Sequence, residues 1–428
     1  MNLAVRAFAS PVRNLELLQL VAALAFVAVG WRALEASPAA PPAGLASVVP
    51  QLVITVLAGH TVLRVVAPEA SPLPFAVGVF LASVGLVIVA RLDPSVAQAQ
   101  ANWISLGVVL AAAGAVVGKR YELLRRQRYT AAALALALLL ITGMLGSTIN
   151  GARLWLNVGG QLVQTTEIIK VLLVVFVAGY LADEAAVLSV PPVRFRARRY
   201  SMIPRLIPLV VALGASIGAL ALLRDLGSIA ILLLFAGGML FIGTGRLRYP
   251  AAAAVVALVA AALGYVAFDH AQTRIDTWLD PWSDASGTGY QSIQAIYAIE
   301  AGGITGTGLG LGRPDAIPAA PTDYVFSAIT EEMGLAAAAG VALVYVLFLY
   351  GGLRVAIDCP DRFGRMLASS IAVLIGIQAA VIIAGNLRLA PTTGITLPFV
   401  SYGGSSLVVN FFLAGILTGI SQSSSSRR

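Results

Sequence analysis

The sequence predicts an all-α polytopic membrane protein with about twelve transmembrane helices. Of its 428 residues, 59% are hydrophobic and only 11% are charged, whereas a soluble domain carries about a quarter charged residues. The apolar residues also gather in twelve runs, each near the ~20 residues that a helix needs to cross a bilayer. These runs lie at residues 15–33, 46–66, 73–91, 102–118, 129–147, 163–182, 203–222, 227–243, 249–268, 324–350, 367–386 and 403–420.

The basic residues predict how these spans are oriented. With the N-terminus placed in the cytoplasm, twenty of the 28 basic residues fall in the loops of the inner side. Because cytoplasmic loops carry an excess of Lys and Arg, we expect a multi-pass protein of the cytoplasmic membrane with both termini cytoplasmic. The net charge of +8 then reflects topology and contact with anionic membrane lipids, not nucleic acid. The single cysteine, Cys359, excludes an internal disulfide.

Prolines divide the chain into two parts. A connection broken by Pro68, Pro72 and Pro74 follows the second run, so we predict an N-terminal accessory pair of helices at 1–70 and a ten-helix core at 71–428. Within the core, residues 269–322 lack a membrane-length apolar run, which predicts one large extracellular loop. Its glycine series, 302–312, lacks the Lys-Ser/Thr pair of a nucleotide-binding loop, so we exclude ATP and expect backbone that approaches a substrate closely.

A polar stripe begins where this loop meets the next span. Offsets of 0, 4, 7, 8 and 11 place its members on one helix face, which must meet protein or water and not lipid. Glu332 points away from that face and needs a separate partner. The first member is either the N-cap of the helix or a functional carboxylate. The stripe consists of Asp323, Ser327, Thr330, Glu331 and Gly334.

Charged residues also enter the sixth span. Glu167 and Lys170 lie three residues apart, so they share a helix face. Unpaired charge in an apolar span is costly, so the pair either locks the bundle by neutralising itself or places Lys170, with Arg153, near an anionic substrate. Farther on, Asp225 is expected to cap the helix that follows it. Residues 386–403 hold prolines and glycines that make a continuous helix there improbable.

Five stretches in this order resemble the SEDS proteins, the family of RodA and FtsW. The resemblance covers about residues 73–421. It rests on Asn150-Gly151-Ala152-Arg153-x-Trp155 with Gln164-x-x-Glu167-x-x-Lys170, on Asp225-Leu226-Gly227, on Gly289-Tyr290-Gln291-x-x-Gln294, on Thr322-Asp323-Tyr324-x-Phe326 with Glu331-Glu332-x-Gly334, and on Leu397-Pro398-Phe399-x-Ser401-Tyr402-Gly403-Gly404-Ser405-Ser406.

The resemblance implies a peptidoglycan glycosyltransferase that polymerises lipid II at the outer face of the cytoplasmic membrane, for cell elongation or division. The family's essential aspartate falls on Asp323, the expected catalytic residue. The chain departs from the family at Ala319, where a glutamate is frequent, and at Thr165, where proline is usual. The residues expected to bind substrate are Arg153, Glu167, Lys170, Gln291, Gln294, Thr322, Arg388 and Ser401.

The chemistry of such a reaction fits these residue types. Sugar transfer needs a base to activate an acceptor hydroxyl, the role expected of Asp323, and cations to stabilise a departing pyrophosphate, a role that suits Arg153, Lys170 and Arg388. No ligand spacing demands a resident metal, although Mg²⁺ or Mn²⁺ bridging pyrophosphate and carboxylates is compatible with the residues. The partner that the resemblance implies is a class B penicillin-binding protein, a transpeptidase.

Two other functions stay open at this point. Twelve spans, buried charges and broken segments also suit a lipid II flippase, although no inverted repeat is visible. A non-catalytic scaffold that recruits a transpeptidase is the other alternative. The most informative experiment is polymerisation of labelled lipid II by the purified chain, with and without a class B penicillin-binding protein.

Overall fold

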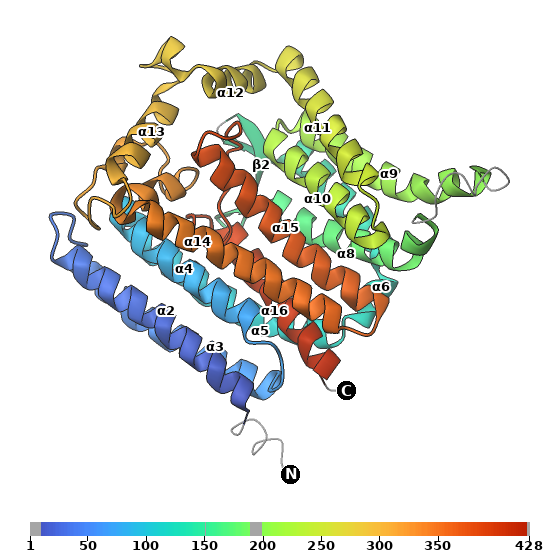
Figure 1. Cartoon of the computed structure of the whole chain (residues 1–428), viewed down its shortest axis with the longest axis horizontal. Coiled ribbons are helices and arrows are strands. Elements are labelled where there is room, and N and C mark those ends of the chain that lie inside the picture. The colour runs from blue at the N-terminus through green and yellow to red at the C-terminus, as the bar shows by residue number, and fades with distance from the viewer. Residues whose placement is uncertain (1–9, 150, 189–198, 426–428) are drawn as a thin grey trace. The chain divides into compact units, whose positions relative to one another are not determined.

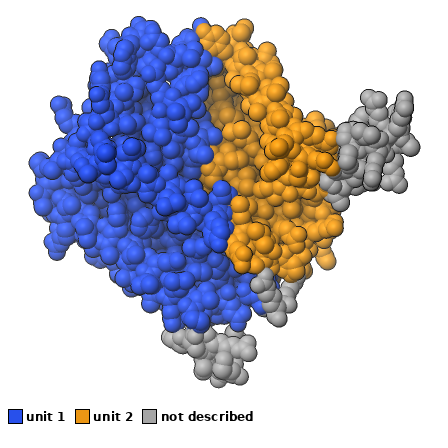
Figure 2. Space-filling view, in the orientation of Figure 1, with its two compact units in different colours: residues 1–119, 272–351, 378–428 blue, residues 120–271, 352–377 orange. Residues whose placement is uncertain are grey.

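The computed structural model describes residues 10–149, 151–188 and 199–425. Asn150 and the basic residues Arg6, Arg194, Arg196, Arg198, Arg427 and Arg428 lie outside them. The chain forms two compact units, which Figure 2 colours separately and which are described here one at a time. Unit 1 comprises residues 1–119, 272–351 and 378–428, and unit 2 comprises residues 120–271 and 352–377.

Unit 1 contains the N-terminal helices and most of the C-terminal ones (Figure 1). Its elements are α2 (Pro11–Glu35), η1 (Ala43–Leu45), α3 (Val48–Val66), α4 (Leu73–Leu92), α5 (Pro94–Lys119), most of α12 (Asp269–Leu279), η3 (Pro281–Asp284), α13 (Tyr290–Gly302), η4 (Pro314–Ala316), most of α14 (Val325–Asp358), the end of α15 (Arg362–Asn386) and α16 (Gly404–Ser425). Helices α2 and α3 lie along α4 and α5. Helix α4 lies at the centre of the unit, and 89% of its most apolar stretch is buried.

Unit 2 combines helices with a small sheet. Its elements are α6 (Glu122–Arg126), α7 (Arg128–Leu145), β1 (Ser147–Ile149), β2 (Ala152–Val158), β3 (Gln161–Gln164), α8 (Thr165–Leu188), α9 (Arg199–Leu222), α10 (Leu226–Thr244) and α11 (Arg248–Ala267), with the end of α14 and the first part of α15. The Asp225 carboxylate accepts a hydrogen bond from the Ser228 N–H at 2.9 Å, so its predicted role as the N-cap of α10 is confirmed.

The predicted fold class is confirmed. Eleven helices of the described residues are long and apolar enough to cross a membrane. The remaining predicted span, 203–222, lies within α9 (Arg199–Leu222), and its apolar part among the described residues is Leu206–Leu222. The sheet was not predicted: β1, β2 and β3 form an antiparallel order β1-β2-β3 that turns at Gly159 and Gly160, both with positive φ.

Residues 387–403 form no helix, as the prolines and glycines predicted. The second part of the segment is nevertheless buried: Phe399 is 1% exposed and Val400 is fully enclosed. A Cβ atom on Gly85 of α4 would collide with the Val400 carbonyl, so the segment passes directly against α4. Side chains supply hydrogen bonds that a helix would have made, since Tyr345 donates to the Pro398 carbonyl and Gln378 to that of Thr396. Such backbone is tolerated at membrane depth only inside protein.

Helix α14 is broken at Gly334, where φ is 81° and ψ is 168°. The glycine series fills the break, because its backbone approaches that of α14 so closely that a Cβ atom on Gly334 would collide with the Ile304 carbonyl. Four backbone hydrogen bonds of 2.9–3.2 Å join the two segments: Thr307 N–H to Glu331 O, Gly308 N–H to Glu332 O, Leu335 N–H to Gly303 O and Ala336 N–H to Ile304 O. The close approach that we expected toward a substrate is made, in this structure, toward α14.

Three members of the predicted polar stripe, Ser327, Thr330 and Glu331, face protein on α14, whereas Asp323 lies in the turn before the helix and Gly334 at its break. Ser327 and Thr330 are fully buried and Glu331 is 6% exposed. Glu332 has the separate partner that it needed, because Arg91 of α4 donates from Nε to Glu332 Oε1 at 2.8 Å. The same guanidinium donates to the Gly312 carbonyl at 3.0 Å. This Arg91–Glu332 pair therefore fastens the glycine series to α4 and α14 together.

Candidate active site

Asp323 lies in unit 1 at the end of a tight turn that precedes α14. Ala319 adopts a positive φ of 55°, and its carbonyl accepts hydrogen bonds from the Thr322 and Asp323 N–H groups at 3.1 and 3.0 Å and from the Thr322 hydroxyl at 3.1 Å. Non-glycine residues rarely adopt such a φ, and strain of this kind persists only where its surroundings hold it. The turn therefore fixes the Asp323 N–H directly and the preceding residue, Thr322, through two further bonds.

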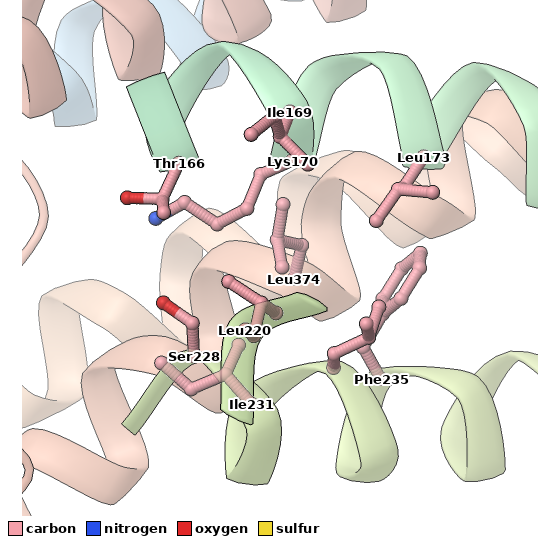
Figure 3. Close-up of a pocket in the computed structure, with 10 residues that line it drawn as sticks. Thr166, Ile169, Lys170, Leu173, Leu220, Ser228, Ile231, Phe235 and Leu374 are labelled. Carbon is pink, nitrogen blue, oxygen red and sulfur yellow. The ribbon is translucent and has the colours of Figure 1, made fainter. Parts of the chain in front are cut away.

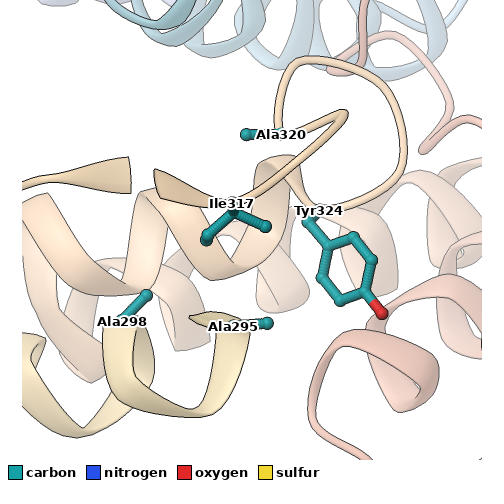
Figure 4. Close-up of a cluster of buried hydrophobic side chains, with 5 residues drawn as sticks. All are labelled: Ala295, Ala298, Ile317, Ala320 and Tyr324. Carbon is teal, nitrogen blue, oxygen red and sulfur yellow. The ribbon is translucent and has the colours of Figure 1, made fainter. Parts of the chain in front are cut away.

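An apolar cluster supports this turn from below. It packs Ile317, Ala320 and Tyr324 against Ala295 and Ala298 of α13. Figure 4 shows Ile317 and the Tyr324 ring facing the two alanines. Tyr324 is 3% exposed, and its hydroxyl lies 3.3 Å from that of Ser292. The cluster joins α13, on one side of the glycine series, to the residue that follows Asp323.

Asn386 fastens the other side of the turn. This last residue of α15 donates from Nδ2 to the Asp323 carbonyl at 2.9 Å. Its Oδ1 accepts hydrogen bonds from the N–H and the hydroxyl of Ser327, each at 3.2 Å. Ser327 lies in the first turn of α14, whose N–H groups have no partner within the helix. Asn386 thus takes the capping role that we considered for Asp323, and the Asp323 carboxylate is left for another task.

The Asp323 side chain is half-buried beside a cationic pocket. The pocket encloses about 310 Å³ of empty space, counting the part open to the exterior, and its lining includes Arg274, Ser292, Tyr324, Asn386 and Thr392. Burial raises the pKa of the Asp323 carboxyl, while a hydrogen bond from Thr322 and the charge of Arg274 act to lower it. Arg274 also donates to the Thr392 carbonyl at 2.8 Å.

Arg274 is the residue of this pocket that the sequence analysis did not select. It is the one basic residue of α12, among Asp269 and Asp276, and it lies about fifty residues before Asp323. A lone cation in an acidic stretch was the available signal. Its proximity to Asp323 depends on how α12 packs, which no local spacing reveals.

Side chains of other expected residues in unit 1 donate hydrogen bonds to main-chain carbonyls of the turn that precedes Asp323. Ser401 is 3% exposed; its hydroxyl donates to the Thr322 carbonyl at 2.6 Å and accepts from the Leu397 N–H at 2.9 Å. Gln291 donates to the Pro318 carbonyl at 2.6 Å, and Gln294 is half-buried one turn farther along α13. In these positions Ser401, Gln291 and Thr322 hold the turn at Ala319.

Arg388 is exposed and lines the same pocket. Its guanidinium donates to the carbonyls of Trp278 and Leu279 at 3.0 and 2.8 Å, while the Trp278 indole donates back to the Arg388 carbonyl at 3.0 Å. These three bonds close the end of α12 onto residue 388. Substrate binding by Arg388 stays a prediction, and the structure adds that this residue holds the helix that carries Arg274.

Unit 2 brings the remaining expected residues together. Lys170 donates to Glu167 Oε1 at 2.8 Å, and their side chains are 13% and 2% exposed. Lys170 also lines a mostly apolar pocket of about 370 Å³, counting the part open to the exterior. Figure 3 shows its side chain running along the wall toward Thr166, with Ser228 across the cavity. A cation at the edge of an apolar cavity suits a ligand with an anionic head and a hydrocarbon tail.

Arg153 lies on β2 next to this helix. Its side chain is exposed and donates to the Gly143 carbonyl of α7 at 3.0 Å. The hairpin is joined to the helices through Thr165, whose hydroxyl donates to the Leu154 carbonyl at 3.1 Å and accepts from Thr142 at 2.8 Å. The departure from proline at Thr165 therefore supplies a fastening point for the hairpin that bears Arg153.

The donor set around Asp323 does not fit a resident metal ion. Across residues 10–149, 151–188 and 199–425, no three side chains of His, Cys, Asp or Glu gather closely enough to hold one. Mg²⁺ and Ca²⁺ prefer several oxygen ligands, whereas Asp323 is a single carboxylate under the influence of a guanidinium.

Comparison with known proteins agrees with these features. The model of a family described as "Cell cycle protein", which unites FtsW, RodA and SpoVE, matches residues 72–426. The peptidoglycan glycosyltransferase RodA of Mycobacterium tuberculosis is 33% identical over 376 residues, which cover 85% of this chain and 80% of the relative. A probable peptidoglycan glycosyltransferase FtsW of Geobacter sulfurreducens is 36% identical over 288 residues, covering 67% and 74%.

Solved structures show the same fold. One chain from a peptidoglycan synthase complex, whose structure concerns the coordination of polymerisation and crosslinking, superposes with a TM-score of 0.66 at 27% identity and covers 81% of this chain and 95% of its own. The rod shape determining protein RodA of Thermus thermophilus superposes with a TM-score of 0.59 at 24% identity, covering 81% and 94%.

Proposed function

Because this chain belongs to the SEDS family of FtsW, RodA and SpoVE, we propose that Asp323 is the general base with which it polymerises lipid II. The chain is a multi-pass membrane protein and a peptidoglycan glycosyltransferase. One observation carries the assignment of the base. The carboxylate of Asp323 is free of the helix-capping role, which Asn386 performs, while its main chain is held from several sides.

The reaction joins two amphipathic, membrane-bound sugars. The Asp323 carboxylate takes the proton from an acceptor sugar hydroxyl as that oxygen forms a bond to the donor's anomeric carbon, and the bond from that carbon to the pyrophosphate oxygen breaks. An oriented base contributes typically 10²–10⁴-fold to such a step. Burial raises the pKa of Asp323, which makes its carboxylate a stronger base than an exposed aspartate.

The leaving pyrophosphate requires positive charge. In unit 1 we assign this task to Arg274, which lines the pocket beside Asp323. In unit 2, Lys170 and Arg153 are assigned to an anionic lipid head, and the apolar pocket at Lys170 to the first part of its hydrocarbon tail. A divalent cation, Mg²⁺ or Mn²⁺, enters this proposal only as an ion bound by the substrate's pyrophosphate, and no step depends on it.

The proposed partner is a transpeptidase of the class B penicillin-binding type. The support for it is the similar chain from a complex described as coordinating polymerisation and crosslinking. A physical reason is that glycan strands need crosslinks soon after synthesis at the same membrane surface.

The proposed site faces the outside of the cell, with both termini in the cytoplasm. A cysteine introduced at the exposed Ser286 should then react with a membrane-impermeant thiol reagent in intact cells, after Cys359 has been replaced. A cysteine at the exposed Arg126 is the control on the other side and should be shielded. The reverse labelling pattern would place Asp323 in the cytoplasm and remove lipid II at the outer face as its substrate.

Asp323→Asn tests the general base. Polymerisation of labelled lipid II should slow by about 10²-fold or more, while lipid II binding persists. Because the folded state raises the pKa of Asp323 above the usual ~3.9, the folded state binds this proton more tightly than the unfolded state. The stability that this proton contributes is therefore lost as pH rises from the pKa of the unfolded state through the higher pKa of the folded state. At neutral pH, asparagine should leave the thermal stability unchanged or raise it.

Matched variants complete this experiment. Asp315→Asn changes a largely exposed carboxylate of the same segment and should polymerise at the normal rate, whereas Asp323→Glu should be slow because an added methylene displaces the base. A normal rate for Asp323→Asn would refute the assignment of the base. A wild-type chain that translocates lipid II without polymerising it would favour the flippase alternative.

A further inference from the structure

The N-terminal helix pair α2–α3 lies before the residues that the family model matches, which begin at 72. It nevertheless belongs to unit 1, together with Asp323. The question is what a helix pair outside the family's common core does in the unit that holds the proposed base.

One face of α2 seats the glycine series. Gly30 and Leu34 lie four residues apart in α2, so they share one helix face, and Ser37 lies two residues beyond the end of α2. A Cβ atom on Gly30 would lie 3.8 Å from Leu309 Cδ2. One on Gly310 would lie 3.5 Å from Leu34 Cδ2 and would collide with Ser37 Oγ. Leu34 is fully buried. This contact surface, which we call the α2 seat, consists of Gly30, Leu34 and Ser37.

The glycine series contacts both the seat and the Arg91–Glu332 pair. Gly310, which lies on Ser37, donates its N–H to Glu332 Oε2 at 3.0 Å. Glu332 accepts from Arg91 through its other oxygen. The sequence of contacts therefore runs from α2 through Gly310 to Glu332, on the segment of α14 between Asp323 and the break at Gly334.

The opposite end of α2 is held rigidly. The fully buried Arg13 donates to the carbonyls of Ala67 and Ala70, each at 3.0 Å, and pairs with Glu16. Glu16 in turn accepts from His60 of α3, with 2.8 Å between Oε1 and Nδ1. Residues 67–70 lead directly into α4, the helix that carries Arg91. Both ends of α2 are thus connected to the elements that hold the glycine series.

We propose that the N-terminal pair is a positioning element of the glycosyltransferase: the α2 seat presses the glycine series into the break of α14 and so fixes the helix that begins behind Asp323. This inference rests on the proposed function for its effect on rate, but the seat itself is observable without activity. The residues that it names, Gly30, Leu34, Ser37 and Leu309, touch no reacting atom and act through Gly310 and Glu332.

Leu309→Ala removes the loop's side chain from the seat, and Leu311→Ala is its matched control, since Leu311 in the same loop is 62% exposed. Amide hydrogen exchange is measured on the full chain in detergent. The N–H groups of 307–310 should exchange roughly tenfold faster in Leu309→Ala and at the normal rate in Leu311→Ala. Equal exchange in the two variants would overturn the seat, whether or not the chain polymerises lipid II.

A second pair of variants tests the effect on catalysis. Ser37→Trp places a bulky ring between the seat and Gly310, and Ala33→Trp places the same bulk on the exposed side of α2. We expect kcat on lipid II to fall about tenfold or more for Ser37→Trp at nearly unchanged KM, with Ala33→Trp like the wild type. Faster exchange of 307–310 in Ser37→Trp with an unchanged kcat would overturn the positioning role.

A double-mutant cycle shows whether the seat acts through Glu332. Replacing Arg91 and Glu332 together by glutamine removes the pair without leaving a lone buried charge. When Ser37→Trp is added to that double variant, kcat should fall further by less than about twofold. If the fold-losses in kcat from Ser37→Trp and from the double replacement multiply, α2 and the Arg91–Glu332 pair act independently, which contradicts the proposed route.

Discussion

Asn386 offers the sharpest structural test of how Asp323 is held. Its side chain makes four hydrogen bonds, two from Nδ2 to the carbonyls of Asp323 and Ile382 and two from Ser327 to Oδ1, all between 2.9 and 3.2 Å. Asn386→Ala removes all four. The Ile382 carbonyl lies within α15 and keeps its helical bond, so the groups left without a partner are the Ser327 N–H, the Ser327 hydroxyl and the Asp323 carbonyl.

The size of the effect follows from those three groups. Ser327 is fully buried and Asn386 is 5% exposed, so water replaces the lost partners poorly. A buried polar group without a partner costs about 1–3 kcal/mol, so three of them predict a loss of about 3–9 kcal/mol in the free energy of unfolding. The main chain of Asp323 also gains freedom. Because a displacement of about 1 Å can lower a rate ~10²-fold, polymerisation should fall by one to two orders of magnitude.

The assay combines unfolding in detergent with the rate of glycan synthesis from labelled lipid II. Asn102→Ala is the control: Asn102 is exposed in the same unit and accepts hydrogen bonds from Gln51 and Gln98 only, so its loss should stay within about 0.5 kcal/mol. Asn386→Asp keeps the acceptor for Ser327 and removes the donor to Asp323, which separates the cap from the anchor. If Asn386→Ala unfolds and polymerises like Asn102→Ala, the reasoning about the turn is refuted.

Two further predictions concern charge. Arg274→Gln should move the acidic limb of the rate–pH profile upward, because Arg274 lowers the pKa of Asp323 and its removal lets burial raise that pKa further; Arg274→Lys should restore the limb, and an unmoved limb in Arg274→Gln would exclude this influence. Lys170→Ala strands the Glu167 carboxylate, which is 2% exposed, and should cost about 3–5 kcal/mol, whereas the double change to alanine should cost less; equal stability of the two variants with equal loss of activity would make the pair a substrate site instead of a lock.

The transmembrane architecture could be predicted from sequence because a bilayer imposes a length and a polarity on each span. The broken segment 387–403 and the cap at Asp225 were also legible, since both depend on local backbone chemistry. The hairpin at 147–164 was legible in principle: Gly159-Gly160 between alternating strands is a recognised turn signal. It escapes prediction because its strands are only three, seven and four residues long.

The neighbours of Asp323 could not be predicted in this way. Asn386 lies 63 residues after it, and Arg274 about fifty before it, and nothing in the intervening sequence fixes that they meet. The same holds for Arg388, a basic residue selected for its charge that donates to the carbonyls of Trp278 and Leu279. Sequence spacing reveals which residues share a helix face, whereas contacts between loops depend on the packing of whole helices.

The setting of Asp323 explains why an aspartate can serve as a base here at all. An ordinary aspartate, with a pKa of about 3.9, is ionised at neutral pH but accepts a proton weakly, and the most effective base has a pKa near the working pH. Burial moves the pKa of Asp323 in that direction, while Thr322 and Arg274 act to lower it. The two influences that lower the pKa come from different segments, Thr322 from the turn at Ala319 and Arg274 from helix α12. A variant that shifts α12, such as one that breaks the contacts of Arg388 with Trp278 and Leu279, should therefore change the pH dependence of the rate and not only its height.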